Sequence, residues 1–432
     1  MKVLVIGSGA REHALVRSLS LDPTVDAVVA APGNPGIEAV APCEALPGGV
    51  SDATSVVDLA TRLGVDLVVI GPEAPLVAGV ADAVRAAGIA CFGPSAEAAR
   101  LEGSKAFAKE VMSAAEVPTG LAHVCTTLQQ VADAIDALGA PHVVKDDGLA
   151  GGKGVVVTDD REEALEHARS CLAKEDGRVV VEEFLDGPEV SLFCLSDGTT
   201  VVPLTPAQDF KRVGDDDTGP NTGGMGAYSP LDWAPEGLVA DVVARVAQPT
   251  IEEMRRRGTP FAGVLYVGLA LTSRGPRVIE FNARFGDPET QVVLARLLTP
   301  LAAVLHAAAT GRLGDIEPLR WSTDHAVTVV VAAADYPATP RTGDLITGAD
   351  ALVGDPTAYV LHAGTARGAD GLLVSAGGRV LSVVATGDSL AEARRRVYAV
   401  VAGIDLPGSH HRTDIALRAE RGAVVLAPRT VT

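Results

Sequence analysis

Val3-Leu4-Val5-Ile6-Gly7-Ser8-Gly9-Ala10-Arg11-Glu12 opens the chain with four apolar residues, a glycine turn and a helical pattern that reaches residue 20. The same order of apolar run and helical segment recurs up to residue 92, with apolar runs at 25–31, 67–70 and 89–92 and helical patterns at 53–63 and 75–87. Short apolar runs that alternate with helices are typical of a parallel sheet with crossover helices. The sequence therefore predicts an N-terminal parallel α/β domain over residues 1–103.

Three glycine-containing loops follow the first three predicted strands: Gly7-Ser8-Gly9, Pro32-Gly33-Asn34 and Gly71-Pro72-Glu73. Ligands of such sheets bind beyond the carboxyl ends of the strands, so these loops should converge on one site. The first loop nearly matches GxGxxG, but Glu12 replaces the third glycine, which disfavours a dinucleotide site. Two interpretations remain, a ligand-free tight turn, or a helix N-terminus with Arg11 nearby that binds a small phosphorylated ligand.

Composition excludes several classes of protein. The 432 residues allow two to four domains, and 47% hydrophobic with 21% charged residues excludes wholesale disorder. A net charge of −19 disfavours nucleic acid and anionic membranes as partners. The apolar runs are too short for a membrane helix or a secretory signal. Five scattered cysteines without CxxC spacing indicate a reducing compartment, which we expect to be the cytoplasm.

A second unit begins after Pro118. Residues 119–189 alternate predicted strands (142–145, 155–158 and 179–183) with predicted helices (127–138 and 161–173). They form a small α+β module of the size of a lid. Within it, the strand ending at Lys145 leads through Gly148-Leu149-Ala150-Gly151-Gly152-Lys153-Gly154 into the next strand, so the loop is a hairpin tip and not a Walker A motif. Its glycines and the two lysines suit a polyphosphate, and the alternative is a solvated surface hairpin.

The segment Arg277-Val278-Ile279-Glu280-Phe281-Asn282-Ala283-Arg284 has the period of a strand. It should place Glu280, Asn282 and Arg284 on one face, with Ile279 and Phe281 on the packed face. Glu280 and the Asn282 amide oxygen match the oxygen ligands that Mg²⁺ takes from proteins. Arg284 can then bind a phosphoryl group. A solvent-facing strand edge is the alternative, and the polar turn that follows at 286–289 favours a site.

The rest of the chain supplies the larger half of the predicted site and a covering domain. Residues 104–118 and 190–320 should form the core, with long strands at 263–271 and 277–282 and helices near 235–257 and 289–310. Residues 321–432 should form a small β-rich C-terminal domain with a helix at 389–401. The loop at 214–226 lacks the ligand order of a calcium site. Lys211-Arg212 before it is either a phosphate anchor or surface charge.

Several long strings give the sequence a family resemblance. They are VLVIGSGAREHAL (3–15), GPEAPLVAGV (71–80), LEGSKAF (101–107), the 145–154 loop, VEEFLDGPEVS (181–191), QDFKRVGDDDTGPNTGGMGAYSP (208–230), VIEFNARFGDPETQ (278–291) and LHAGT (361–365). Over nearly its whole length the chain resembles the phosphoribosylamine-glycine ligase (glycinamide ribonucleotide synthetase) family of the ATP-grasp superfamily. The resemblance implies a pre-ATP-grasp N-terminal domain and an ATP-grasp core with a mobile lid.

The resemblance also implies an activity in purine biosynthesis, the ATP-dependent joining of glycine to 5-phosphoribosylamine through a glycyl phosphate. It implies ATP as co-substrate, Mg²⁺ or Mn²⁺ as cofactor, and small-molecule substrates as the partners of a monomer. Site residues carried over or supported by it fall into four groups. The catalytic residues would be Arg284, Asp209 and Asp287, and the metal ligands Glu280 and Asn282. The ATP-binding residues would be Lys105, Lys145, Gly151, Gly152, Lys153, Gly154, Glu182, Glu183, Phe184, Leu185 and Glu189. The substrate-binding residues would be Gly9, Arg11, Asn34, Glu73, Arg212 and Gly286.

Two positions depart from the family pattern, since Asp146 and Phe210 stand where the family has alanine and histidine. Asp146 should add negative charge beside the triphosphate and weaken nucleotide binding. The alternative functions are another ATP-grasp carboxylate-amine ligase or carboxylase of purine metabolism, a nicotinamide dehydrogenase, and a nucleotide-binding module without turnover. Acceptor dependence of ADP release distinguishes the ligases.

Overall fold

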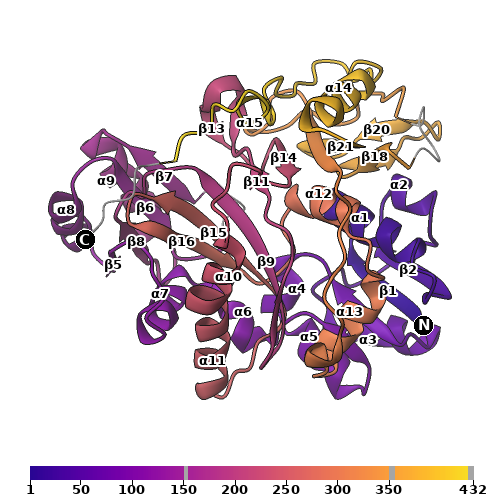
Figure 1. Cartoon of the computed structure of the whole chain (residues 1–432), viewed down its shortest axis with the longest axis horizontal. Coiled ribbons are helices and arrows are strands. Elements are labelled where there is room, and N and C mark those ends of the chain that lie inside the picture. The colour runs from indigo at the N-terminus through magenta and orange to yellow at the C-terminus, as the bar shows by residue number, and fades with distance from the viewer. Residues whose placement is uncertain (150–153, 350–355, 427–432) are drawn as a thin grey trace.

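The computed structural model describes residues 1–149, 154–349 and 356–426. Its N-terminal part is a four-stranded parallel sheet in the order β2-β1-β3-β4, which confirms the predicted α/β arrangement (Figure 1). The strands are β1 (Lys2–Gly7), β2 (Ala27–Pro32), β3 (Leu67–Ile70) and β4 (Ala90–Phe92). The helices that accompany them are α1 (Ala10–Ser20), α2 (Pro35–Glu38), α3 (Ala53–Leu63), α4 (Glu73–Val77) and α5 (Val80–Ala86).

The predicted helix over 75–87 is divided in the structure. Gly79 has φ +81°, a left-handed conformation that separates α4 from α5. Two helices then lead toward the core, α6 (Ala96–Gly103) and α7 (Lys105–Ala114). Ser95 and Ser104 are their N-caps, because each hydroxyl accepts a backbone N–H of the first helical turn.

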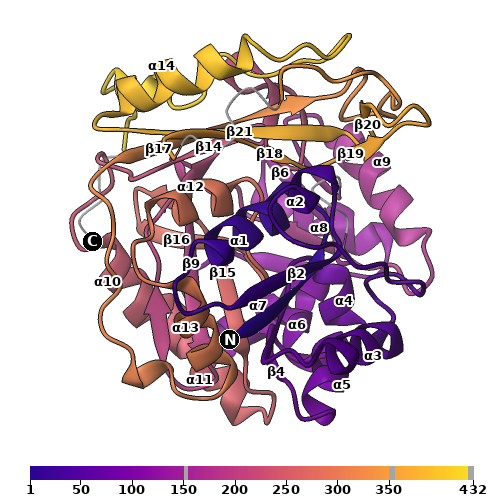
Figure 2. The ribbon, with the colours of Figure 1, turned by 90° about the vertical axis from the view of Figure 1, so that its right-hand side faces the viewer.

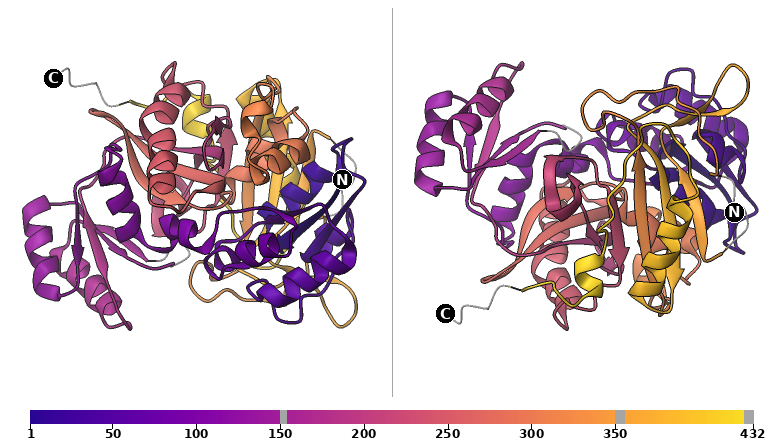
Figure 3. Two further views of the ribbon diagram at one scale, coloured as in Figure 1. Left: turned by 90° about the horizontal axis from the view of Figure 1, so that it is seen from below. Right: turned by 90° about the horizontal axis from the view of Figure 1, so that it is seen from above.

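The lid module, in purple at the left of both views in Figure 3, is an antiparallel sheet in the order β5-β8-β6-β7 with two helices. It has its own small hydrophobic core. Its elements are β5 (Ala122–Cys125), α8 (Leu128–Leu138), β6 (His142–Asp146), β7 (Val155–Thr158), α9 (Arg161–Leu172) and β8 (Val179–Glu182). Val144 and Val181 pack from the sheet against Ile135 of α8 and Ala168 of α9. Because one face of the sheet is filled by these helices, the other face is left for the site.

The core sheet is antiparallel in the order β10-β9-β15-β16. Its strands are β9 (Glu189–Asp197), β10 (Val201–Pro203), β15 (Ala262–Thr272) and β16 (Gly275–Asn282). The two helices predicted in this part are interrupted. The first consists of α10 (Leu238–Val242), a π-helical turn and α11 (Gln248–Arg256), because Pro249 has no N–H to continue an α-helical ladder. The second is divided at Pro300 into α12 (Glu289–Arg296) and α13 (Leu301–Ala309).

The C-terminal sheet combines strands from two parts of the chain (Figure 2). Its order is β11-β14-β17-β21-β18, and α14 (Leu390–Val401) packs against β17 and β21. The strands are β11 (Gln208–Asp209), β14 (Gly226–Ser229), β17 (His325–Ala332), β18 (Ala358–His362) and β21 (Arg379–Gly387). Segment 208–229, expected in the core, thus extends the C-terminal sheet. The pairing of β14 with β17 therefore joins segment 208–229 to the C-terminal strands.

Small elements complete the architecture. Two-stranded ribbons join β12 (Arg212–Gly214) to β13 (Thr218–Asn221) and β19 (Thr365–Arg367) to β20 (Leu373–Ser375), and α15 (Leu417–Glu420) lies near the end of the chain. Across the three described ranges, no helix combines the length and apolar character needed to span a bilayer.

Candidate active site

The proposed metal ligands lie at the end of β16. Across the strands, Glu280 pairs with Gly268 and Asn282 pairs with Tyr266. The two side chains therefore share one face of β16, and the buried Phe281 between them points to the other face. A β-bulge shifts the register between residues 278 and 280. The predicted packing of Ile279 is therefore wrong, because Val278 and Phe281 are the buried residues and Ile279 is only half-buried.

Lysines surround Glu280. Desolvation raises the pKa of the Glu280 carboxyl, but the charges of Lys211, Lys145, Lys105 and Arg284 outweigh it, so the pKa lies below its ordinary value. An ionised carboxylate beside an amide oxygen suits a hard divalent cation. Among the described residues no group of three His, Cys, Asp or Glu side chains forms a metal site. The two oxygen donors match an ion that takes its other ligands from phosphates and water.

The predicted ATP-binding residue Glu182 joins the buried Lys145 and the half-buried Lys109. Its Oε2 lies 3.0 Å from Lys145 Nζ and 3.2 Å from Lys109 Nζ, and Lys145 also donates to the Ile279 carbonyl at 3.2 Å. Burial lowers the pKa of Lys109, while Glu182 opposes that shift. Sequence reasoning missed Lys109, although it follows Lys105 by four residues and thus shares its helix face. Lys105 donates to the Gly148 carbonyl at 2.9 Å.

The glycine loop is described only in part. Gly151, Gly152 and Lys153 lie outside the described residues, while the Gly154 carbonyl accepts the N–H of Asp146 at 2.8 Å. Asp146 is buried and forms an ion pair with Lys174. Lys174 therefore compensates the negative charge of Asp146 within the lid. The expectation that Asp146 weakens nucleotide binding assumed an uncompensated charge, which the structure does not show.

The residues predicted to meet adenine and ribose follow β8. Phe184 is exposed, and Glu183 pairs with Arg274 while its N–H donates to the Leu121 carbonyl at 2.8 Å. Leu185 is half-buried on the same bend. Glu189 begins β9, and its carboxylate lies 2.5 Å from Lys211 Nζ. Lys211 therefore has a partner inside the site, which favours a role there over simple surface charge.

Arg284 connects the core to the N-terminal part. Its Nη2 lies 2.9 Å from Glu102 Oε1 and its Nε 3.3 Å from Glu73 Oε2. Desolvation raises the pKa of Glu102 against the opposing charge of Arg284. Glu102 also accepts the Ala283 N–H at 2.8 Å. Sequence reasoning assigned no role to Glu102, which here fixes both the side chain of Arg284 and the backbone before it.

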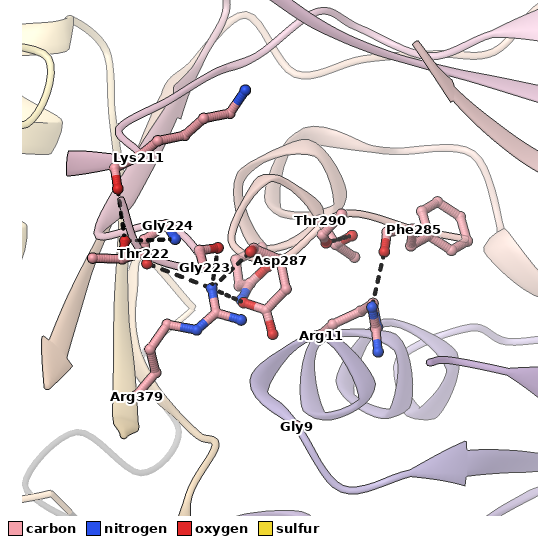
Figure 4. A network of polar contacts seen from close by, with 12 residues as sticks. Gly9, Arg11, Lys211, Thr222, Gly223, Gly224, Phe285, Asp287, Thr290 and Arg379 are labelled. Atoms are coloured by element: carbon pink, nitrogen blue, oxygen red, sulfur yellow. Dashed lines mark hydrogen bonds and ion pairs between the residues drawn. The ribbon is translucent and has the colours of Figure 1, made fainter. Parts of the chain in front are cut away.

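The first glycine loop is occupied by Glu12. Its carboxylate accepts the Gly9 N–H and the Arg11 Nε–H, both at 2.6 Å. Arg11 Nη1 donates to the Phe285 carbonyl at 3.1 Å (Figure 4). A Cβ on Gly7 or Gly71 would lie within 2.5 Å of Glu12. Glu12 thus fills the space that the third glycine leaves open in a dinucleotide-binding fold.

The side-chain amide of Asn34 forms hydrogen bonds through both its nitrogen and its oxygen. Its Nδ2 donates to the carbonyls of Ser8 (2.8 Å) and His362 (2.9 Å), and its Oδ1 caps α2 by accepting the N–H groups of Gly36 and Ile37. Arg212 similarly donates to the Gly219 carbonyl of its own ribbon. The side chains of both predicted substrate-binding residues therefore already have protein partners.

Asp209 lies in a buried polar cluster that the sequence did not reveal. Ser191 Oγ is 2.8 Å from Tyr266 Oη, 3.2 Å from Glu289 Oε1 and 3.5 Å from Asp209 Oδ1. Desolvation, opposed by Lys211 and reinforced by Glu289, raises the pKa of Asp209 to about 7. A Cβ on Gly286 would lie 2.6 Å from Glu289 Oε2, so this glycine makes room for the cluster.

Asp287 faces the glycine loop of α1, because a Cβ on Gly9 would lie 3.7 Å from Asp287 Oδ2. Gln291 donates to Asp287 Oδ1 at 2.8 Å. Desolvation raises the pKa of Asp287, but Arg379 and Arg11 overcome it and hold the pKa below its ordinary value. The structure thus brings together the predicted residues Gly9, Arg11 and Asp287.

A glycine-tipped antiparallel hairpin, buried lysines and an opposing sheet with two oxygen donors define the ATP-grasp class. The sequence matches phosphoribosylglycinamide synthetase in three consecutive domains, the N domain at 1–102, the ATP-grasp (A) domain at 103–290 and the C domain at 326–418. The chain belongs to the phosphoribosylglycinamide synthetase family. The family's ATP-grasp domain accounts for the use of ATP with a divalent metal ion.

Relatives and solved structures agree with this assignment. The phosphoribosylamine–glycine ligase of Streptomyces coelicolor is 68% identical over 421 residues, covering 97% of this chain and 99% of that protein. The Mycobacterium tuberculosis ligase is 56% identical over 430 residues, covering 98% and 100%. The crystal structure of the Thermotoga maritima ligase has a TM-score of 0.83 at 32% identity, covering 96% and 100%. A Campylobacter jejuni biotin carboxylase, with 14% identity, a TM-score of 0.72 and coverage of 97% and 95%, shares the fold alone.

Proposed function

We propose that this chain joins glycine to 5-phosphoribosylamine, consuming ATP and yielding glycinamide ribonucleotide, ADP and phosphate in purine biosynthesis. The observation that carries the proposal is the correspondence of the whole chain, in all three domains, to ligases named for this reaction. The side chains of the candidate site supply the charges that such a reaction needs.

The first step transfers a phosphoryl group. A carboxylate oxygen of glycine attacks the γ-phosphorus, the bond from that phosphorus to the β–γ bridging oxygen breaks, and ADP leaves with its electron pair. Lys105, Lys145 and Arg284 compensate the negative charge that develops. Gly151, Gly152, Lys153 and Gly154 cover the polyphosphate, Glu182 holds Lys145, and Glu183, Phe184, Leu185 and Glu189 receive adenosine.

Glu280 and Asn282 would hold Mg²⁺ or Mn²⁺, whose charge stabilises the phosphates when bound. The lowered pKa of Glu280 keeps its carboxylate ionised at neutral pH, so the ligand is ready without loss of a proton. The four cations around it make this pair unsuited to bind a metal ion alone. Binding of the ion should therefore depend on the phosphates of ATP.

The second step forms the amide. The amine of the phosphosugar attacks the acyl carbon, the carbon–oxygen bond to phosphate breaks, and phosphate leaves. Asp209, whose pKa is about 7, is the group that accepts the proton released by the amine, and Asp287, which stays ionised, is the second catalytic carboxylate. Gly9, Arg11, Asn34, Glu73, Arg212 and Gly286 form the surroundings of the phosphosugar. Because water would hydrolyse the acyl phosphate, the lid at 119–189 closes over the site.

Further properties complete the proposal. The domain boundaries are 1–103, 104–118 with 190–320, 119–189 and 321–432. The enzyme acts as a monomer on small molecules, binds no nucleic acid, and works in the cytoplasm, in keeping with its five unpaired cysteines.

The test is the substrate dependence of ADP release by the purified chain. Release that requires both glycine and phosphoribosylamine, generated in place from ribose 5-phosphate and ammonia, together with a product of the mass of glycinamide ribonucleotide, supports the proposal. Release driven by bicarbonate, or by another amino acid in place of glycine, would instead identify a different ATP-grasp enzyme. Binding of ATP without turnover would identify a binding module.

A further inference from the structure

One side chain of the C-terminal sheet enters the candidate site from a distant part of the sequence. Arg379, the first residue of β21, donates through Nη1 to the carbonyls of Gly223 and Asp287, both at 2.7 Å (Figure 4). The same nitrogen lies 3.4 Å from the Gly224 carbonyl and 3.5 Å from Asp287 Oδ1. Two separate segments of the site therefore share one guanidinium.

The joint between these segments is built without spare room. A Cβ on Gly223 would lie 3.1 Å from Arg379 Cζ. Gly224 has φ +113°, and a Cβ there would lie 2.4 Å from Pro288 Cδ. Both glycines are thus required by the close approach of the turn to Arg379 and to residues 287–288. This packing indicates a fixed geometry.

The two segments differ in how they depend on Arg379. Asp287 is held by it directly, through both its carbonyl and its carboxylate. Lys211, on the other segment, is tied to Thr222, whose N–H and hydroxyl donate to the Lys211 carbonyl at 2.7 and 2.9 Å. Loss of Arg379 should therefore disturb Asp287 first. Since Asp287 faces Gly9, the disturbance should fall on the side of the site beside the N-terminal loops.

We propose that Arg379 is a positioning residue for the phosphosugar acceptor, acting through Asp287 and the 223–224 turn. This inference rests on the proposed function, which places the phosphosugar between Gly9 and Asp287. The C-terminal sheet then does more than cover the site, because it fixes the carboxylate that meets the acceptor. A lysine should replace this guanidinium only in part, since its ammonium keeps the charge but not the planar shape of the guanidinium.

The decisive experiment compares KM values of Arg379→Met with those of the wild type for all three substrates. The KM for phosphoribosylamine should rise at least tenfold, while those for ATP and glycine should change less than about twofold. Arg395→Met is the matched control, because Arg395 is exposed on α14 and pairs there with Glu392. It should leave all three KM values unchanged.

Chemical rescue separates positioning from general structural support. Millimolar guanidinium ion should restore part of the acceptor affinity of Arg379→Ala, and Arg379→Lys should fall between wild type and Arg379→Met. The role of Arg379 would be overturned by an unchanged KM for phosphoribosylamine. It would also be overturned if all three KM values rose equally and guanidinium ion rescued none of the variants. A wild type that forms no glycinamide ribonucleotide would refute the proposed function itself, so the two failures are distinguishable.

Discussion

Replacing Glu182 by glutamine removes the carboxylate that Lys145 and Lys109 share. At 3.0 Å and an effective dielectric constant of about 20, one such pair attracts by about 5.5 kcal/mol before desolvation is subtracted. Measured losses on breaking a buried pair are about 3–5 kcal/mol. A lysine can also escape by releasing its proton at pH 7, which costs at most about 4.6 kcal/mol from an ordinary pKa of about 10.4. We therefore expect the lid to lose about 3–5 kcal/mol of stability.

Hydrogen exchange of peptides that contain β6 and β8 measures this loss of stability locally. Tryptophan fluorescence would not report on the lid, because both tryptophans of the chain lie outside it. The matched control is Glu183→Gln, because the neighbouring carboxylate forms its ion pair with Arg274 at a more exposed position and should lose less than about 1 kcal/mol. Glu182→Gln should also raise the KM for ATP, since Lys145 loses its anchor. Equal, small effects of both substitutions would refute the reasoning that Glu182 compensates the two lysines.

Three more predictions concern individual side chains. Glu280→Gln should lower kcat by orders of magnitude and leave far-UV circular dichroism unchanged, and normal turnover at ordinary magnesium would remove Glu280 from the metal site. Asp209 has a raised pKa, so the folded protein favours its protonated form and loses stability as pH rises through the acid range to about 7. Asp209→Asn should therefore gain stability over wild type between pH 5 and 7 in urea unfolding, and a constant difference across that range would contradict the shift. Asp146→Ala should leave the KM for ATP within about twofold of wild type, because Lys174 already compensates that charge, and a marked fall in KM would instead support repulsion of the triphosphate.

The sequence predicted the parts of the fold that depend on local pattern. The strands and helices of the lid agree closely with the predicted ones, because the consecutive valines at 155–157 and 179–181 and the capping residues Thr127 and Asp160 are local signals. The bulge at Ile279 was not predictable, since it depends on the register against β15. The interruption of the predicted helix at 235–257 differs, because Pro249 is a local signal that the prediction of one continuous helix overlooked.

The candidate site was predictable where its residues lie in one motif, such as Glu280, Asn282 and Arg284. It was not predictable where partners are far apart along the chain. Arg379 meets Asp287 across 92 residues, and Glu102 meets Ala283 across 181. No periodicity or spacing reports such contacts, because they arise only when separate sheets pack together.

Transfer of ¹⁸O tests the central claim most directly. When the chain turns over ATP and phosphoribosylamine with glycine that carries ¹⁸O in both carboxylate oxygens, a glycyl phosphate must pass one labelled oxygen to phosphate for each amide formed. Mass spectrometry should find one ¹⁸O in the released phosphate and one in glycinamide ribonucleotide. Phosphate without label, or hydrolysis of ATP without the amide product, would contradict the account.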